Sequence, residues 1–348
     1  MSPTWSWKKI VLAIAKITVS MLILSLLFNQ ARQENQFAEI ASRPKNWHWL
    51  STAFVLVFMA HFVSFVRWRS LVEALEIPFT TFDATRIGLI GVFFGLFAFG
   101  LVGGDSLRIY YAARDQKNKV PEVVCSVFLD RAIGMLVMFT FASVGFLFVD
   151  LNIENSQNPE QLKTIRYVCT IIALCTAAGW TCVFTFLFTP QLTSFKPVRW
   201  LIGLPKVGNL FQQLLDALVL YRKRIDCLIA CVGWSAVVNV CFVAAIYLTA
   251  VGINAPHPPF EKHFVIAPIS TASNAIPLPG GIGGMEFVLS YFYGAISSND
   301  ENINFGISVA IAFRFFLLMI AALGALAWFL SRKQIKKVVE SEDFQQSE

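Results

Sequence analysis

The stretch IPLPGGIGGME, from Ile276 to Glu286, lies inside a long apolar region of the chain. Proline and glycine are the two residues least compatible with a helix interior, so a continuous membrane helix is excluded here. Non-helical backbone is tolerated at membrane depth only where protein buries it or where it lines a water-filled cavity. The stretch therefore predicts a break at the tip of a hairpin.

The composition of the 348-residue chain predicts an integral membrane protein, because 56% of its residues are hydrophobic and only 14% are charged. Soluble domains carry about 25% charged residues. The runs long enough to span a bilayer predict about six spanning helices. These runs are residues 10–28, 47–66, 122–149, 166–189, 226–251 and 305–330. We expect one all-α transmembrane domain over residues 1–330 and a charged cytoplasmic tail over 331–348.

Two further apolar regions, 87–112 and 264–297, are interrupted by glycine clusters. Lys and Arg are enriched in cytoplasmic loops of membrane proteins. Most of these residues fall on one side only if region 87–112 begins and ends in the cytoplasm and region 264–297 begins and ends outside. The simplest model has two re-entrant hairpins, one from each face, with both termini cytoplasmic. Two short tilted spans in each region would give the same ends.

Charged side chains at bilayer depth are costly, about 2.5–3.5 kcal/mol on insertion scales, and they commonly mark functional sites. Structural pairing is the competing interpretation: Asp105 and Arg108 are three residues apart, and Asp130 has Arg314 or Arg108 as candidate partners. The candidate substrate-binding residues are Asp105, Arg108, Asp130, Arg131, Glu286 and Arg314.

Small residues and prolines near these charges predict the hairpin tips and close helix packing. Gly91-x-x-x-Gly95 is a spacing that lets membrane helices approach closely. Residues 205–224 predict an amphipathic interfacial helix with a basic end. The candidate hairpin residues are Gly103, Gly104, Pro277, Pro279, Gly280, Gly281, Gly283 and Gly284.

The sequence shows no catalytic or metal-binding constellation. Its 4 histidines and 7 cysteines are scattered and have no metal-ligand spacing. We expect no cofactor and no metal, and we expect that the chain is not an enzyme.

Three ordered motifs resemble the transmembrane, flippase-like domain of lysylphosphatidylglycerol synthases, which also occurs as stand-alone membrane proteins. They are GLVGGDSLR (Gly100 to Arg108), LDRAIG (Leu129 to Gly134) and PLPGGIGGME (Pro277 to Glu286). Arg314 stands at the place of a late arginine in that family. Two positions depart from the family pattern: Phe99 replaces a usual proline, and Met285 replaces a frequent arginine.

The resemblance implies that a lipid or lipid-linked headgroup is bound and translocated at a cell membrane. It implies no synthase activity, because the cytosolic aminoacyl-transferase domain of the two-domain synthases is not in this sequence. The expected partner is a membrane phospholipid or lipid-linked substrate, and no nucleic acid is expected. Two alternatives stay open: an accessory subunit for a separate lipid-modifying enzyme or glycosyltransferase, and a membrane transferase.

Overall fold

The computed structural model describes residues 41–97, 101–114, 119–148, 159–188, 208–275, 283–296 and 305–345, together with Ser25 and Asn29. Every regular element in these residues is helical, and no strand occurs among them. In this part of the chain, 5 helices are long and apolar enough to cross a membrane. They are α3 (Trp47–Ala74), α6 (Val120–Phe148), α7 (Pro159–Phe188), α10 (Ile225–Gly252) and α13 (Gly306–Gln345). The chain is an all-α polytopic membrane protein, as the sequence predicts.

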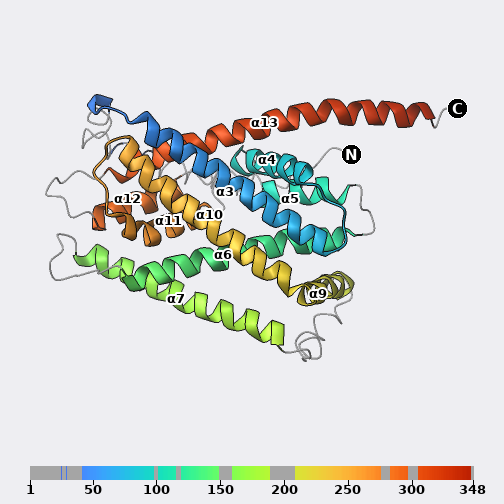
Figure 1. Ribbon diagram of the computed structural model, residues 1–348, viewed down its shortest axis with the longest axis horizontal. Coiled ribbons are helices and arrows are strands. Elements are labelled where there is room, and N and C mark those ends of the chain that lie inside the picture. Colours follow the sequence, from blue (N-terminus) through green and yellow to red (C-terminus); the bar gives the residue numbers. More distant parts are fainter. Residues whose placement is uncertain are drawn as a thin grey trace, which may run out of the picture.

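The long helices run side by side along the longest axis of the molecule (Figure 1). α10 packs along α3, α6 contacts both of them and also α7, and α13 contacts α12. Apolar side chains cover the outside of the bundle as well as its core. On α10, for example, Ile229 and Val237 are exposed while Val243 and Ile246 are buried. Helices that are apolar on all sides are expected where lipid replaces water around the protein.

Several helices are longer than the apolar runs that predict them. α3 continues past residue 66 to Ala74, and α7 begins at Pro159 rather than at 166. Hydropathy marks the lipid-facing length, whereas helical hydrogen bonding continues through good helix formers such as Arg69 and Glu73. α13 likewise continues past residue 330 to Gln345. The predicted first span, 10–28, lies outside the described residues apart from Ser25.

In each glycine-rich region the structure describes helices on both sides of a short stretch, 98–100 in the first and 276–282 in the second, that lies outside the described residues. The first region forms α4 (Thr81–Phe97) and α5 (Leu101–Ala113), which pack against each other. The second forms the 3-10 turn η2 (Phe260–Lys262), α11 (His263–Ala272), the 3-10 turn η3 (Ser273–Ala275) and α12 (Gly284–Ile296).

Helix length favours re-entrant hairpins over paired short spans. α5 and α12 have 13 residues each, which at 1.5 Å per residue gives a length of about 20 Å. The hydrocarbon core of a bilayer is about 30 Å thick. Neither helix alone is long enough to cross it, which agrees with re-entrant hairpins, and the return of each segment to the side from which it entered stays a prediction.

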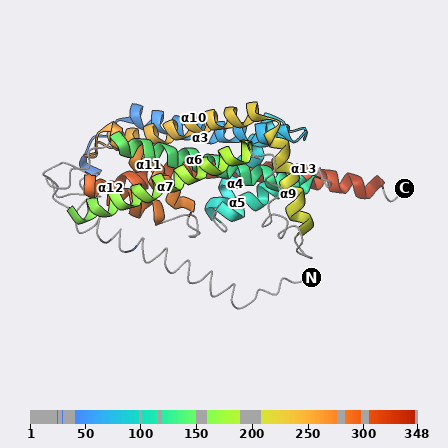
Figure 2. The same cartoon turned by 90° about the horizontal axis from the view of Figure 1, so that it is seen from below.

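The two hairpins enter the bundle from opposite ends (Figures 1 and 2). The α4–α5 hairpin lies at the end that carries α9 (Gly208–Arg222), which we call the α9 end. α9 corresponds to the predicted amphipathic segment, and its buried Tyr221 donates a 2.8 Å hydrogen bond to the carbonyl oxygen of Leu71. Because the basic cluster at 222–224 lies at this end, the charge rule predicts that it faces the cytoplasm. That orientation stays a prediction.

Candidate functional site

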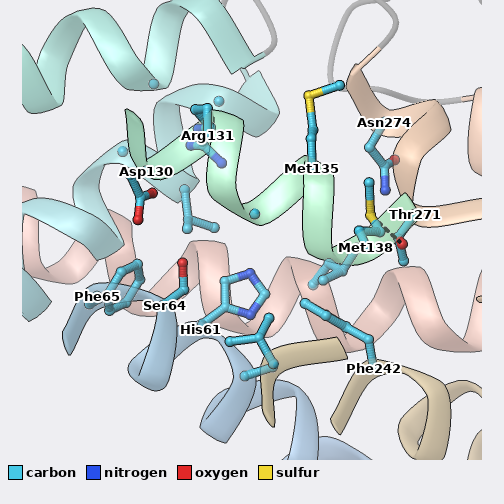
Figure 3. A pocket seen from close by; sticks show the side chains of 18 of the residues that line it. His61, Ser64, Phe65, Asp130, Arg131, Met135, Met138, Phe242, Thr271 and Asn274 are labelled. Carbon is cyan, nitrogen blue, oxygen red and sulfur yellow. Dashed lines mark hydrogen bonds between the residues drawn. The ribbon is translucent and has the colours of Figure 1, made fainter. Parts of the chain in front are cut away.

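A cavity with a volume of about 320 Å³ lies between the two hairpins. Its walls come from α3, α4, α5, α6, α10, α11 and α13 and from Asn274 in η3, and Figure 3 shows part of this lining. The volume is at the lower end of the range for small-molecule sites, about 300–1,000 Å³. Four of the predicted site residues line the cavity: Arg108, Asp130, Arg131 and Arg314. Asp105 and Glu286 each form an ion pair with one of these arginines.

The tip of the α4–α5 hairpin is connected to α6 by a two-point ion pair. Arg131 Nε lies 2.9 Å from Asp105 Oδ2, and Arg131 Nη2 lies 2.6 Å from Asp105 Oδ1. The planar guanidinium matches the two carboxylate oxygens, and this bidentate geometry fixes both side chains. The local pairing of Asp105 with Arg108 is also present, but at 3.8 Å it is the longer of the two contacts.

Arg108 is a buried guanidinium whose hydrogen-bonding capacity is largely unused. Only 4% of the residue is exposed, and its Nε has no hydrogen-bond partner in the described structure. Its guanidinium carbon lies 5.6 Å from the ring centroid of Phe65 and 5.5 Å from that of Trp68. Such cation–π contacts hold a cation in place without neutralising its charge.

Glycines in the α4–α5 hairpin create the space that Arg108 occupies. A Cβ atom at Gly91 would lie 2.8 Å from Arg108 Nε, so a larger residue would displace this side chain. A Cβ atom at Gly104 would collide with the carbonyl oxygen of Gly91 and lie 3.2 Å from the Cα of Gly95. The close packing predicted from the Gly91–Gly95 spacing is therefore confirmed. Gly103 lies half-buried in the same turn of α5.

Asp130 binds Arg67, not Arg314 or Arg108, so the predicted partners are wrong. Arg67 Nε lies 2.8 Å from Asp130 Oδ1, and the two side chains are 5% and 1% exposed. Arg67 also donates to the Ser235 hydroxyl at 2.7 Å and to the backbone carbonyl of Asp130 at 3.2 Å. A Cβ atom at Gly134, the last residue of the LDRAIG motif, would lie 3.2 Å from both terminal nitrogens of Arg67. This glycine therefore leaves room for the ion pair.

The second hairpin is connected to α13 by the ion pair between Glu286 and Arg314. Arg314 Nε lies 2.7 Å from Glu286 Oε1, and Nη2 lies 3.1 Å from Oε2. Glu286 Oε2 also accepts a 2.9 Å hydrogen bond from the backbone N–H of Gly283. Arg314 Nη2 approaches Asn274 Oδ1 at 3.4 Å. One carboxylate thus joins the start of α12 to α13, beside the cavity.

Backbone geometry explains two of the four glycines in the opening stretch. Gly283 has φ of 97°, in the left-handed region that glycine adopts without steric cost. A Cβ atom at Gly284 would lie 3.1 Å from the carbonyl oxygen of Ser273, so η3 and α12 approach each other closely there. The other predicted tip residues, Pro277, Pro279, Gly280 and Gly281, lie outside the described residues.

The sequence motifs missed several polar residues that the structure places in the cavity wall. These are His61 and Ser64 on α3, Arg67 on the same helix, Asn239 on α10, and Asn274. His61 Nδ1 lies 2.9 Å from the carbonyl oxygen of Val57. Figure 3 shows its ring between Asp130 and Ser64 on one side and Phe242 and Thr271 on the other. A histidine in the middle of an apolar span was the available signal, since polar residues at that depth are rare.

The described residues contain no group of three or more His, Cys, Asp or Glu side chains that could hold a metal ion. Most of the cavity wall is apolar, and its ionic groups are the guanidinium groups of Arg67, Arg108, Arg131 and Arg314 and the carboxylate of Asp130. These groups bind and orient an ionic ligand through charge-assisted hydrogen bonds.

Comparison with known families agrees with the order of the three motifs. The family model described as "Lysylphosphatidylglycerol synthase TM region" matches residues 13–335 of the chain. No curated protein and no solved structure matched it. The match spans both hairpins, four of the long helices in full and α13 as far as residue 335.

Proposed function

Because this chain belongs to the lysylphosphatidylglycerol synthase TM region family, we propose that it binds the anionic headgroup of a membrane lipid in the cavity and translocates it. The lipid tails remain in the hydrocarbon while the headgroup crosses through the cavity, past the arginines in its wall. The single observation that supports this most strongly is the buried, incompletely paired guanidinium of Arg108. We also propose that the protein acts as a transporter and catalyses no chemical reaction.

The charge balance around the cavity favours an anionic ligand. In the described structure, arginines that line the cavity outnumber the carboxylates that line it or bind those arginines. The arginines are Arg67, Arg108, Arg131 and Arg314, and the carboxylates are Asp105, Asp130 and Glu286. A buried cation without a full counter-ion is costly, and a phosphate group would remove that cost. Guanidinium binds phosphate through two parallel hydrogen bonds, which suits Arg108 to this role.

The existing ion pairs also provide a way for the ligand to leave. Arg131 and Arg314 have carboxylate partners, Asp105 and Glu286, that hold them in the absence of phosphate. A headgroup can exchange with these carboxylates and then be displaced by them. Transport requires binding that is strong enough for entry and weak enough for release. Each hairpin supplies the carboxylate of one of these ion pairs, Asp105 in the first and Glu286 in the second. The headgroup can therefore bind first at one pair and then at the other.

The proposal is tested with purified protein in liposomes that contain tail-labelled fluorescent phosphatidylglycerol. A membrane-impermeant reductant destroys the fluorescence of lipids that reach the outer leaflet. We expect wild-type protein to bring inner-leaflet lipid to the reductant, so that fluorescence falls below the plateau of protein-free liposomes. Arg108→Ala should restore that plateau.

The matched control is Arg86→Ala, which removes an arginine from the same hairpin. Arg86 forms an ion pair with Asp83 at 3.4 Å and lies outside the cavity wall. We expect it to transport at the wild-type rate. Wild-type transport by Arg108→Ala would contradict the proposed site. A wild-type plateau equal to that of protein-free liposomes would contradict passive translocation and favour an accessory subunit, which would co-purify with a lipid-modifying enzyme.

A further inference from the structure

We infer that Trp68 is a positioning residue for Arg108, because its ring helps to hold the guanidinium group where the N–H groups stay available to a ligand. With Phe65, it keeps the guanidinium away from Asp105, the carboxylate that competes for it. The inference rests on the proposed function and adds a residue that belongs to none of the sequence motifs. It depends on two observations: the aromatic contacts of Arg108 and the length of its ion pair with Asp105.

Two aromatic rings of α3 face the guanidinium group of Arg108. Phe65 and Trp68 lie three residues apart, so both project from the same face of that helix. The guanidinium carbon is 5.6 Å from the ring centroid of Phe65 and 5.5 Å from that of Trp68. Both distances lie within the range of about 6 Å in which the face of an aromatic ring attracts a cation, and tryptophan attracts it most strongly. We call these two side chains the aromatic clamp.

The ring of Trp68 is fixed by its own contacts. Its Nε1–H donates a 3.3 Å hydrogen bond to the Ser126 hydroxyl, which itself donates to the carbonyl oxygen of Val123 at 2.8 Å. The indole also packs edge-to-face against Phe79, with 5.0 Å between the ring centroids. Trp68 is fully buried and does not line the cavity. It therefore acts on a ligand in the cavity only through Arg108.

Glycines of α4 leave room for both partners of this contact. A Cβ atom at Gly91 would lie 2.8 Å from Arg108 Nε, and a Cβ atom at Gly88 would collide with the ring of Phe65. The guanidinium group and the ring thus fit closely between α3 and α4. A side chain held in this way keeps one position before the ligand arrives, which lowers the cost of binding.

Asp105 is the carboxylate that competes with the clamp for Arg108. The two residues lie three apart on α5, yet Arg108 Nη1 is 3.8 Å from Asp105 Oδ1, which is beyond hydrogen-bond length. The same carboxylate lies 2.6 and 2.9 Å from the guanidinium nitrogens of Arg131. A guanidinium that binds a carboxylate through two N–H groups has fewer donors left for a phosphate. The clamp therefore leaves Asp105 to Arg131 and keeps Arg108 open to the ligand.

The strength of one cation–π contact sets the size of the expected effect. In a buried site such a contact changes an equilibrium constant by about fivefold to thirtyfold. Loss of the Trp68 ring shifts Arg108 from the clamp toward Asp105 by up to that factor. The apparent affinity for a ligand falls with the fraction of protein that has the binding-competent arrangement.

The first test changes the electron density of the ring with little change in its shape. Trp68 is replaced in the full-length protein by mono-, di- and trifluorinated tryptophan, because fluorine withdraws electrons from the face that attracts the cation. The readout is the concentration of phosphatidylglycerol that half-saturates the detergent-purified protein, measured by native mass spectrometry. We expect this concentration to rise with each added fluorine, by up to about thirtyfold in total.

The matched control is the same series at Trp180, whose Nε1–H also donates to a hydroxyl group, that of Thr140, at 2.9 Å. Fluorination there should leave the half-saturating concentration unchanged. A concentration that does not change with fluorination at position 68, or that changes equally at both positions, would overturn the inference.

The second test removes the ring and the competing charge separately and together. Trp68→Leu should raise the half-saturating concentration by about fivefold to thirtyfold. In the Asp105→Asn background the same substitution should raise it by less than about twofold, since no carboxylate competes for Arg108 there. Trp68→Phe keeps an aromatic face and should recover most of the affinity. A purely structural role of Trp68 predicts the same factor in both backgrounds, and that result would contradict the inference.

A structure separates this inference from the proposed function, because it requires no ligand. In Trp68→Leu and in the trifluorinated protein, which preserves the packing of the ring, we expect Arg108 to move to about 3 Å from Asp105. An Arg108 side chain that stays 5.6 Å from Phe65 and 3.8 Å from Asp105 would overturn the inference. If Arg108 moves as expected but the wild type retains no phosphatidylglycerol, the clamp is supported and the proposed function is contradicted.

Discussion

The buried ion pair between Arg67 and Asp130 allows a quantitative test of how the cavity wall is built. Both side chains are at least nine-tenths buried, with 5% and 1% exposed, and their closest atoms are 2.8 Å apart. Asp130→Ala leaves the guanidinium with the Ser235 hydroxyl and one backbone carbonyl as partners. Removing one partner of a buried pair typically costs about 3–5 kcal/mol, because an uncompensated charge remains. We expect a loss of that size for Asp130→Ala and for Arg67→Met.

The double variant should be close to the wild type in stability, since replacing both charges by apolar groups is often neutral or stabilising. With single losses of about 3–5 kcal/mol each, a double-mutant cycle should therefore give a coupling energy of about 6 kcal/mol or more. The measurement is unfolding in mixed detergent and SDS, followed by tryptophan fluorescence. The control cycle uses Arg69 and Glu73, an exposed pair on the same helix at 2.7 Å, for which about 0.3–0.5 kcal/mol is expected. If the two cycles give equal coupling energies, the reasoning about burial is refuted.

Three further predictions concern the two hairpins and the orientation of the α9 end. Gly104→Ala should destabilise the protein by about 1–3 kcal/mol through overpacking against α4, whereas Gly233→Ala, whose Cβ would meet nothing within 4 Å, should be neutral or slightly stabilising in the same unfolding assay. Glu286→Gln keeps the shape of the side chain but loses the charge that Arg314 binds, and it should cost about 1.5–3 kcal/mol; an unchanged stability would contradict the role of this pair in holding α12. A single cysteine at position 223, replacing Lys223 in a variant without other cysteines, should react with an impermeant maleimide only from the cytoplasmic side. Labelling from outside would reverse the predicted orientation.

Long apolar runs were sufficient to predict the five long helices in the described part of the chain, because lipid exposure requires apolar residues over about 20 positions. At the edge of the second tip the predicted departure from helical backbone agrees with Gly283, whose φ is 97°, whereas residues 98–100 and 276–282 lie outside the described residues. The residues at which helices begin and end were less predictable. α13 continues as a helix into a charged segment that hydropathy excludes, since helix formation does not require an apolar sequence.

The ionic partners could be predicted only in part. Asp105 and Arg108 pair locally because residues three apart share a helix face, but the shorter bonds of Asp105 go to Arg131 on another helix. Arg67 and Arg69 both follow the apolar run 47–66, so hydropathy treats the two residues alike. Residues two apart point about 200° away from each other on a helix, so Arg67 is buried while Arg69 binds the exposed Glu73.

His61 shows a second reason why the site was incompletely predicted. It belongs to none of the sequence motifs, and a single histidine carries no spacing signal. Its place in the site depends on Val57, one turn earlier, whose carbonyl oxygen lies 2.9 Å from Nδ1, and on the cavity whose wall includes the residue. Tertiary structure creates that cavity from helices far apart in the sequence.

The most direct measurement asks whether a lipid headgroup occupies the cavity. A photoreactive diazirine analogue of methionine is placed at Met138, which lines the cavity, and the protein is illuminated in phosphatidylglycerol bilayers. A matched variant carries the same group at Met319, which is 39% exposed on α13 and does not line the cavity. We predict that position 138 crosslinks to the glycerol headgroup and that Arg108→Ala removes this product. Crosslinks to acyl chains alone at both positions, or a headgroup product that survives Arg108→Ala, would contradict headgroup binding by Arg108 in the cavity.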